Sequence, residues 1–394
     1  MRGGNGVPQY VTVRPYFHRS DIWPSMSSSI SQESRKSKYL CEAFKGVILT
    51  EAQESSENSP SSLASTVHKK QAKLIKVDGG DSIQSVAFLV DGKHIVGGGT
   101  EGKIRCWRVK DGALMGTMDA GSHIWDIAVS RDGKWVVGGT TNGLVIVWNA
   151  ASYEKVIAFA AHKWSVRAVD VSPDGTRIVT GSEDSTACVW SLSNGQRLLG
   201  PLKHSLGVVS ANFSPNGRLI ATFAWNCDDR VRIYDSQDGR PLVDVEIQAS
   251  TVPNQSLAWT SDSMNLFVLS MDGSINCLDV STGTTRSKWP IHASHDPTCI
   301  ALASNGTFIA ASAYPSVSLW DTTTHQQIGF ITMDRAFVES IAISANYVLA
   351  MGEGDTITLR SLWDVLPSSY SNPVSAFASE FGCARLFPNH ESLC

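Results

Sequence analysis

The sequence predicts an all-β fold assembled from seven copies of one four-stranded antiparallel unit. Three observations lead to this prediction. A strand-like run of five residues ending in a bulky anchor recurs every 40 to 44 residues, an apolar strand that stops at a tight turn lies about twenty residues before each anchor, and the runs are short and rich in Val and Ile. The anchors are Trp107, Trp148, Trp190, Tyr234, Leu278 and Trp320, and Arg360 takes the same place in the seventh unit.

The third unit shows its strands most clearly. Its first strand runs to the turn Asp174-Gly175, its second is RIVTGS, and its third is the run TACVW that ends at Trp190. Asp-Gly and Asn-Gly supply the positive φ of tight hairpin turns, so each such turn joins two antiparallel strands. A weaker fourth strand follows each anchor, as KVIAFAA follows Trp148. Each unit is therefore expected to be a four-stranded meander.

One meander of this size buries little surface, so the units have to stack on one another. Radial stacking into a closed ring protects the strand edges, which predicts a seven-bladed β-propeller. A period near 42 residues could also come from a pair of helices per repeat. Strand runs of five to seven residues, bounded by Asp-Gly, favour the propeller.

These anchors and turns resemble the WD-repeat β-propeller family, whose unit ends in Trp-Asp. The resemblance covers residues 71–362, although the literal dipeptide survives only at Trp320-Asp321, which leaves the blade boundaries of units five to seven open. The family fixes each blade with a hydrogen-bonded tetrad. The third unit matches all four of its members, His162, Ser182, Asp184 and Trp190.

The resemblance also implies how the ring closes. In this family, a strand from the start of the domain completes the last blade. The segment QAKLIKV, residues 71–77, precedes the first unit and is expected to pair with the strand that ends at Arg360.

The chain divides into three parts. Residues 1–70 carry two Ser-rich tracts and are expected to be mostly disordered, although the apolar patches YVTVRPYF and YLCEAFKGVIL could dock on the propeller or on a partner. Residues 71–362 form the predicted propeller, and residues 363–394 form a tail. In the tail, Val374, Phe377, Phe381 and Ala384 have helical spacing after Pro373, so a short amphipathic helix is expected to pack on the ring or to bind a partner.

The composition excludes several classes of partner. The formal net charge is -4, and no block of Lys and Arg favours nucleic acid or anionic lipid. No apolar run reaches the roughly 20 residues that span a bilayer, and the N-terminus lacks the apolar core of a secretory signal. The eight cysteines are scattered without a metal or disulfide pattern. We expect a soluble cytoplasmic or nuclear protein that forms a monomeric propeller with reduced thiols.

No motif predicts catalysis or a cofactor. The segment GGGTEGK, residues 97–103, resembles a phosphate-binding loop, but such a loop must lead from a strand into a helix, and here Lys103 begins a strand. The cluster of His292, His295 and Asp296 lies in a loop, where solvation is the simpler interpretation than a metal site. We therefore expect no enzyme activity, no cofactor and no metal.

The predicted function is a non-enzymatic platform for protein–protein interaction, since the loops of seven blades present a broad surface on a rigid scaffold. In the family, partners dock most often on the face formed by the loops before each first strand and after each second strand. The candidate partner-binding residues there are Trp125, Lys163, Trp164, Arg167, Glu183, Trp225, Asp229 and Tyr314. Packing of Trp125, Trp164 and Trp225 within the protein is the structural alternative. A substrate receptor of a ubiquitin ligase, and a propeller hydrolase or small-molecule binder, are the alternative functions.

Overall fold

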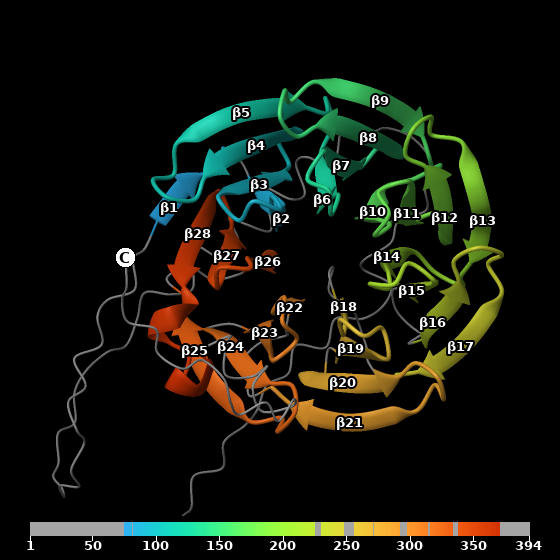
Figure 1. Cartoon of the computed structure of the whole chain (residues 1–394). Coiled ribbons are helices and arrows are strands. Elements are labelled where there is room, and N and C mark those ends of the chain that lie inside the picture. Colours follow the sequence, from blue (N-terminus) through green and yellow to red (C-terminus); the bar gives the residue numbers. More distant parts are fainter. Residues whose placement is uncertain are drawn as a thin grey trace, which may run out of the picture. The chain divides into compact units, whose positions relative to one another are not determined.

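Twenty-eight strands form seven antiparallel sheets arranged as the blades of a ring in the computed structural model (Figure 1). The structure describes residues 75–80, 82–224, 230–247, 256–270, 272–291, 298–313, 316–333 and 338–370. All of them belong to the unit His68–Cys394. The expectation of an all-β propeller with seven four-stranded blades is confirmed. Within the described ranges, no helix combines the length and apolar character needed to cross a membrane.

Four blades follow one another from β2 to β17, each with its strands in order from the centre outward. They are β2 (Ile83–Phe88), β3 (His94–Gly99), β4 (Lys103–Arg108) and β5 (Leu114–Asp119); β6 (Ile124–Val129), β7 (Trp135–Thr140), β8 (Leu144–Asn149) and β9 (Lys155–Ala160); β10 (Val166–Val171), β11 (Arg177–Ser182), β12 (Thr186–Ser191) and β13 (Arg197–Lys203); and β14 (Val208–Phe213), β15 (Leu219–Ala224), β16 (Arg230–Asp235) and β17 (Pro241–Glu246).

The last three blades have shorter inner strands. They are β18 (Leu257–Trp259), β19 (Asn265–Ser270), β20 (Ser274–Asp279) and β21 (Thr285–Pro290); β22 (Cys299–Leu302), β23 (Phe308–Ala313), β24 (Ser316–Asp321) and β25 (Gln327–Thr332); and β26 (Ser340–Ile343), β27 (Val348–Glu353), β28 (Thr356–Ser361) and β1 (Ile75–Asp78). In the seventh blade the outermost strand is thus the first in sequence, since β1 pairs antiparallel with β28 from Ile75↔Leu359 to Asp78↔Thr356.

The turn between the first and second strands of each blade needs one residue in the left-handed region. Glycine occupies this position in five blades, for example Gly175 at φ 70°. Ser263 at φ 62° and Tyr347 at φ 59° take the same position in the fifth and seventh blades. The hairpin geometry therefore persists in the two units that lack the glycine signal.

Each inner strand is a sheet edge, so some of its backbone N–H groups need partners from outside its own blade. At four boundaries, from the seventh blade round to the fourth, a side chain of one inner strand accepts the N–H of the next. The pairs, acceptor first, are Ser340 and Val86 at 3.0 Å, Ser85 and Ile127 at 3.1 Å, Asp126 and Val169 at 3.0 Å, and Asp170 and Phe213 at 2.8 Å.

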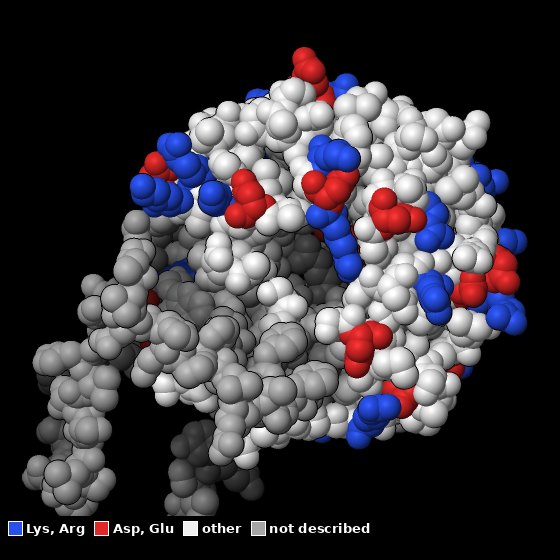
Figure 2. All heavy atoms as spheres, in the orientation of Figure 1, with Lys and Arg blue, Asp and Glu red and all other residues white. Residues whose placement is uncertain are grey.

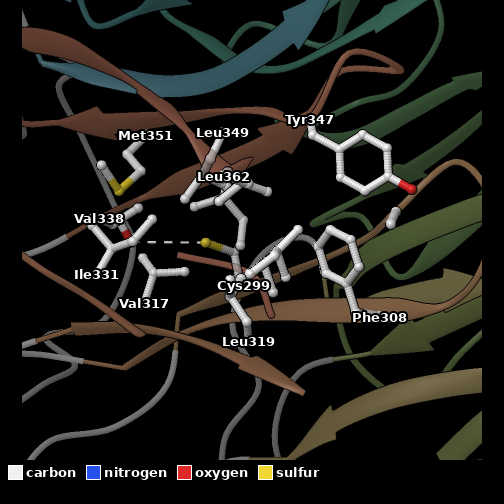
Figure 3. Packing of buried hydrophobic residues seen from close by; sticks show 14 residues of the cluster. Cys299, Phe308, Val317, Leu319, Ile331, Val338, Tyr347, Leu349, Met351 and Leu362 are labelled. Atoms are coloured by element: carbon white, nitrogen blue, oxygen red, sulfur yellow. Dashed lines mark hydrogen bonds between the residues drawn. The ribbon is translucent and has the colours of Figure 1, made fainter. Parts of the chain in front are cut away.

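Apolar side chains fill the space between neighbouring blades. Figure 3 shows the cluster between the sixth and seventh blades, where Phe308 and Leu319 of one blade meet Leu349 and Met351 of the other. Cys299 is buried at its centre, with its Sγ 4.0 Å from the carbonyl oxygen of Val338. Burial raises the pKa of the Cys299 thiol to about 12, so the thiol stays protonated in the core.

Two faces of the ring are distinguished below. The loop face carries the loops that lead into the inner strands, such as residues 161–165, and those that join the second and third strands. The turn face carries the hairpin turns that follow the inner strands, such as residues 172–176, and those that join the third and fourth strands.

On the turn face, the turn after each third strand covers the outermost strand of the preceding blade. At the first boundary Tyr153, in the left-handed region at φ 62°, covers Gly116 of β5. A Cβ atom on Gly116 would lie 2.2 Å from Cδ2 of Tyr153, so the glycine makes room for the ring. At the fifth boundary the ring of His325 stacks on Trp289 at 4.2 Å between centroids.

After β28 the chain forms two short 3₁₀ turns, η2 (Leu362–Asp364) and η3 (Ser368–Tyr370). Val365 covers Gly329 of β25, the position that corresponds to Gly116, and the hydroxyl of Tyr370 donates to Asp321 at the end of β24. These turns lie beside β24 and β25 in Figure 1. The described start of the tail therefore packs on the ring, and the expected helix at Val374, Phe377, Phe381 and Ala384 lies outside the described residues.

Candidate docking surface on the loop face

Trp125 and Arg167 occupy matching irregular positions in the inner strands β6 and β10. In each strand the register with the second strand of the blade shifts at this residue. A bulge leaves its extra residue outside the ladder and redirects the side chain. The two redirected side chains belong to neighbouring blades and meet across the boundary between them.

Arg167 and Trp125 form a cation–π stack. The guanidinium carbon of Arg167 lies 3.4 Å from the centre of the Trp125 ring, and the ring of His123 packs on Trp125 at 4.1 Å between centroids. Arg167 also donates from Nε to Oε1 of Glu183 at 2.7 Å, with Nη2 at 2.6 Å from the same oxygen. Only 10% of the Arg167 side chain is exposed. The sequence thus predicted three residues that the structure brings together, and it missed His123.

Burial lowers the pKa of Arg167, and the Glu183 carboxylate opposes this effect. An arginine side chain stays charged in either case. The indole nitrogen Nε1 of Trp125 is buried and has no hydrogen-bond partner among the described residues. The stack therefore fixes the positions of an aromatic ring, a cation and an anion at one boundary on the loop face.

A buried chain of hydrogen bonds holds the loop before β10 on its blade. Trp190 Nε1 donates to Thr180 Oγ1 at 2.9 Å, Thr180 Oγ1 lies 2.7 Å from His162 Nε2, and His162 Nδ1 lies 3.1 Å from Asp184 Oδ2. Burial would raise the pKa of Asp184, but hydrogen bonds from His162 and Thr186 outweigh it and hold the pKa below its ordinary value.

Thr180, and not Ser182, supplies the hydroxyl in this chain, which corrects the expectation from the sequence. Ile178 lies opposite Trp190 in the β11–β12 register, so Thr180 is the next residue on the same face and its hydroxyl reaches the indole. Ser182 lies one step further and instead accepts the backbone N–H of Asp184 at 3.1 Å. The pairing of Ile178 with Trp190 was the signal that could have identified Thr180, which is two residues from that position, whereas Ser182 is four residues away.

The loop held by this chain presents two exposed side chains. The backbone N–H of Lys163 donates to Asp184 at 3.1 Å, and the side chains of Lys163 and Trp164 face solvent. Trp164 is 54% exposed, so the alternative that it packs in the interior is wrong. Leu206, at the matching position before β14, is 38% exposed. Sequence reasoning missed Leu206, although the aligned loops HKW and HSL carried the signal.

The remaining candidates from the sequence are Trp225, Asp229 and Tyr314. They lie outside the described residues, as do His292, His295 and Asp296. The glycine-rich segment 97–103 forms the hairpin between β3 and β4, with no helix after it.

A cavity of about 320 Å³ lies between the inner strands, lined in part by Asp126 and Asp170. Burial raises the pKa of Asp170 to about 7, while the backbone N–H groups of Val171 and Phe213 oppose the rise. Both carboxylates thus accept hydrogen bonds from the backbone of the ring. Within the described ranges, no three His, Cys, Asp or Glu side chains are placed to hold a metal ion.

Charges on the face shown in Figure 2 are interspersed, with blue and red groups in small clusters around a central hollow. They do not gather into a broad patch of one sign on the part of that face that the structure describes. Such a distribution lacks the basic surface that binds a phosphate backbone.

Four repeats match the family "WD domain, G-beta repeat", at residues 72–108, 112–149, 153–191 and 196–235. Together with the seven blades, these matches decide the family. The chain belongs to the WD-repeat β-propellers. The matches cover the first four units, which have Trp or Tyr anchors. The sixth unit lies outside them although it keeps Trp320-Asp321, as do the units with Leu278 and Arg360.

This WD-repeat propeller is similar in structure to two solved structures, the structure of U3-55K and the crystal structure of RRP9 WD40 repeats. Each has a TM-score of 0.66 and 16% sequence identity, and covers 73% of this chain. The matches cover 98% and 97% of those chains, respectively. At this identity the likeness shows the fold alone. A search among curated proteins found no match.

Proposed function

We propose that this WD-repeat propeller is a non-enzymatic scaffold that binds a protein or peptide partner on the loop face of its second, third and fourth blades. The observation that carries the proposal is the stack of Trp125, Arg167 and Glu183, together with the exposed ring of Trp164 in the loop that leads into the strand of Arg167. Trp and Arg are the residue types that contribute most to binding in protein interfaces. Here Trp125 and Arg167 lie in the inner strands of neighbouring blades, and Trp164 lies in the loop before β10.

Preorganisation supports this assignment. Arg167 is held on both sides, by the indole of Trp125 and by the carboxylate of Glu183, so little side-chain entropy is left to lose on binding. The loop of Trp164 is likewise held by the buried hydrogen bonds to Asp184. A partner would thus meet a surface that is already in its binding geometry.

The chemistry of the surface favours an amphipathic segment of a partner. Trp164 and Leu206 are exposed apolar side chains from adjacent blades, and Lys163 is an exposed cation in the same loop. The charge of Arg167 is already offset by Glu183. This combination suits a protein surface with apolar and acidic side chains better than a uniformly charged polyanion.

The test is affinity purification with the full chain and with the double variant Trp164→Ala, Arg167→Ala. We expect the variant to lose a specific set of protein partners at least about tenfold, as truncation of two central side chains costs more than 1.4 kcal/mol. Trp363→Ala is the matched control, since Trp363 is 41% exposed and lies in η2, away from this surface. Equal recovery of the same partners by the wild type and the double variant would show that the loop face at these blades is not the binding surface.

A further inference from the structure

The boundary between the fourth and fifth blades has an apolar hollow on the turn face. Its volume is about 410 Å³. The lining comes from both blades and includes Leu219, Ile233, Leu242, Val243, Met264 and Val280. Leu242 is 46% exposed and Met264 is 49% exposed, so the hollow opens to solvent between two exposed apolar side chains.

The hollow lies beside a packed contact between the two blades. At the first four boundaries a residue of the outermost strand faces the turn of the next blade, and at the fourth boundary Val243 faces Gly283, 3.0 Å from the place of a Cβ atom. Val243 thus fills the space at Gly283. The hollow opens next to this contact, between Val243 and the turn residues Val280 and Ser281.

The lining of the hollow indicates what kind of side chain fits. Aromatic rings pack on the outermost strand at other boundaries, Tyr153 at the first and His325 at the fifth. The hollow at the fourth boundary has an apolar lining, with Asn216, Ser263 and Ser281 as its polar members. An aromatic ring without a polar group, which is phenylalanine, satisfies this lining best.

The course of the tail indicates where such a ring comes from. The chain leaves the seventh blade at Leu362, Val365 covers Gly329 of the sixth blade, and Tyr370 binds Asp321 of the same blade. The tail thus runs backward around the ring over the same kind of position, on the turn side of the outer strands. Figure 1 shows β21 between β25 and β17 along the rim, so the fifth and fourth blades come next in this direction.

The length of the tail is sufficient. Phe381 is 11 residues beyond Tyr370, a span of up to about 36 Å if the segment docks as an extended chain and not as the helix expected from its spacing. Sheets packed face to face lie about 10 Å apart, more at a splayed rim, and the hollow begins one blade beyond the sixth. Because the tail is tethered, its effective concentration at the hollow is in the millimolar range, which favours its docking over the binding of a separate chain at lower concentration.

We propose that the C-terminal segment 373–384 docks on the turn face and places a phenylalanine, Phe377 or Phe381, in the hollow between the fourth and fifth blades. This contact is independent of the partner surface on the loop face, because it uses the opposite face and residues of this chain only.

The test is disulfide trapping in the full chain. Met264→Cys places a thiol at the rim of the hollow, and the native Cys383 lies two residues beyond Phe381. Under mild oxidation with diamide, we expect a concentration-independent intramolecular bond between these two thiols, identified by peptide mapping. Met115→Cys is the matched control, because Met115 is 42% exposed on β5 at a distant blade. Its bond to Cys383 should form at least about tenfold more slowly.

A second measurement separates docking from chance collision. In the Met264→Cys background, Phe377→Ala with Phe381→Ala should slow the trapping several-fold and speed alkylation of the new thiol. Equal trapping of Met264→Cys and Met115→Cys, or rates unchanged by the two alanines, would overturn the proposal. Trapping of Cys41 instead would assign the hollow to the N-terminal segment, and disulfide dimers that grow with concentration would assign it to a second copy.

Discussion

The hydroxyl of Thr180 accepts the indole N–H of Trp190 at 2.9 Å, deep inside the third blade. The same oxygen lies 2.7 Å from His162 Nε2 and so connects the anchor of the blade to the loop that carries Trp164. One residue thereby couples the stability of the blade to the position of an exposed side chain in the proposed docking surface.

Thr180→Val is expected to destabilise the fold by about 2–4 kcal/mol, because it leaves Trp190 Nε1 and His162 Nε2 buried without a partner. Ser182→Ala should cost less, since Ser182 only accepts one backbone N–H and contacts the carbonyl of Trp164 at 3.4 Å. Urea unfolding of both variants provides the measurement. A larger loss in Ser182→Ala would mean that the hydrogen-bonded chain runs through Ser182 after all.

The pKa of Asp170, raised to about 7, makes one contribution to stability depend on pH. A carboxyl whose folded pKa is raised favours the fold while protonated, so its contribution is complete below about pH 4 and is lost as the pH rises to 7. Asp170→Asn cannot titrate. Relative to this variant, the wild type should lose up to about 1.4 kcal/mol of unfolding free energy per pH unit in that range.

The measurement is urea unfolding of wild type and Asp170→Asn at several values from pH 5 to pH 8. Asp184→Asn is the control, because the pKa of Asp184 lies below its ordinary value and its contribution is lost only as the pH falls below about 4. The difference in unfolding free energy between Asp184→Asn and the wild type should therefore be constant across this range. A constant difference for Asp170→Asn as well would show that Asp170 is ionised throughout.

Gly116 and Tyr153 should behave as a coupled pair. Gly116→Ala is expected to destabilise the fold by about 1–3 kcal/mol, because the new Cβ would meet the tyrosine ring at 2.2 Å. In the background Tyr153→Gly the ring is gone, and the same alanine should be nearly neutral. A double-mutant cycle measured by thermal unfolding gives the coupling. Additive effects would contradict the contact.

The strand β1 should be needed for the closed ring. A chain that starts at residue 78 loses most of β1, exposes the edge of β28 and removes Val77, which is 5% exposed within the cluster that joins the seventh and first blades. We expect the melting temperature to fall by several degrees, because a loss of a few kcal/mol of unfolding free energy lowers it by about that much. A chain that starts at residue 71 keeps β1 and serves as the control. Equal melting temperatures of the two chains would show that the pairing contributes nothing.

The repeated sequence pattern predicts most of the fold. Anchors such as Trp190 and turns such as Asp174-Gly175 lie at fixed offsets, and the antiparallel meander follows from the spacing alone. The seventh unit was harder, because Arg360 replaces the aromatic anchor and Tyr347 takes the left-handed position of the missing glycine. A non-glycine residue at positive φ leaves no local signal, since the surrounding hairpin imposes it.

The docking surface was only partly predictable. Trp125, Arg167 and Glu183 stand out as residue types, but their contact depends on bulges in two strands of different blades, which no spacing reveals. His123 gains its place only from its packing on Trp125, whereas Leu206 could have been found by aligning the loop HSL with HKW. The hollow between the fourth and fifth blades was not predictable at all, because its lining comes from strands and turns of two blades that only the fold brings together.

The pairing of β1 with β28 has a consequence during synthesis. Ile75 pairs with Leu359, so β1 is synthesised first but cannot pair until β28 has been synthesised. At 5–20 residues per second this wait is roughly 15 to 60 s, and the remaining blades can form meanwhile. Until then the segment from Ile75 to Asp78 has no sheet to join, and the nascent protein has open edges at both ends. The ring therefore closes only after translation of the last blade, and its final folding step joins the two ends of the propeller.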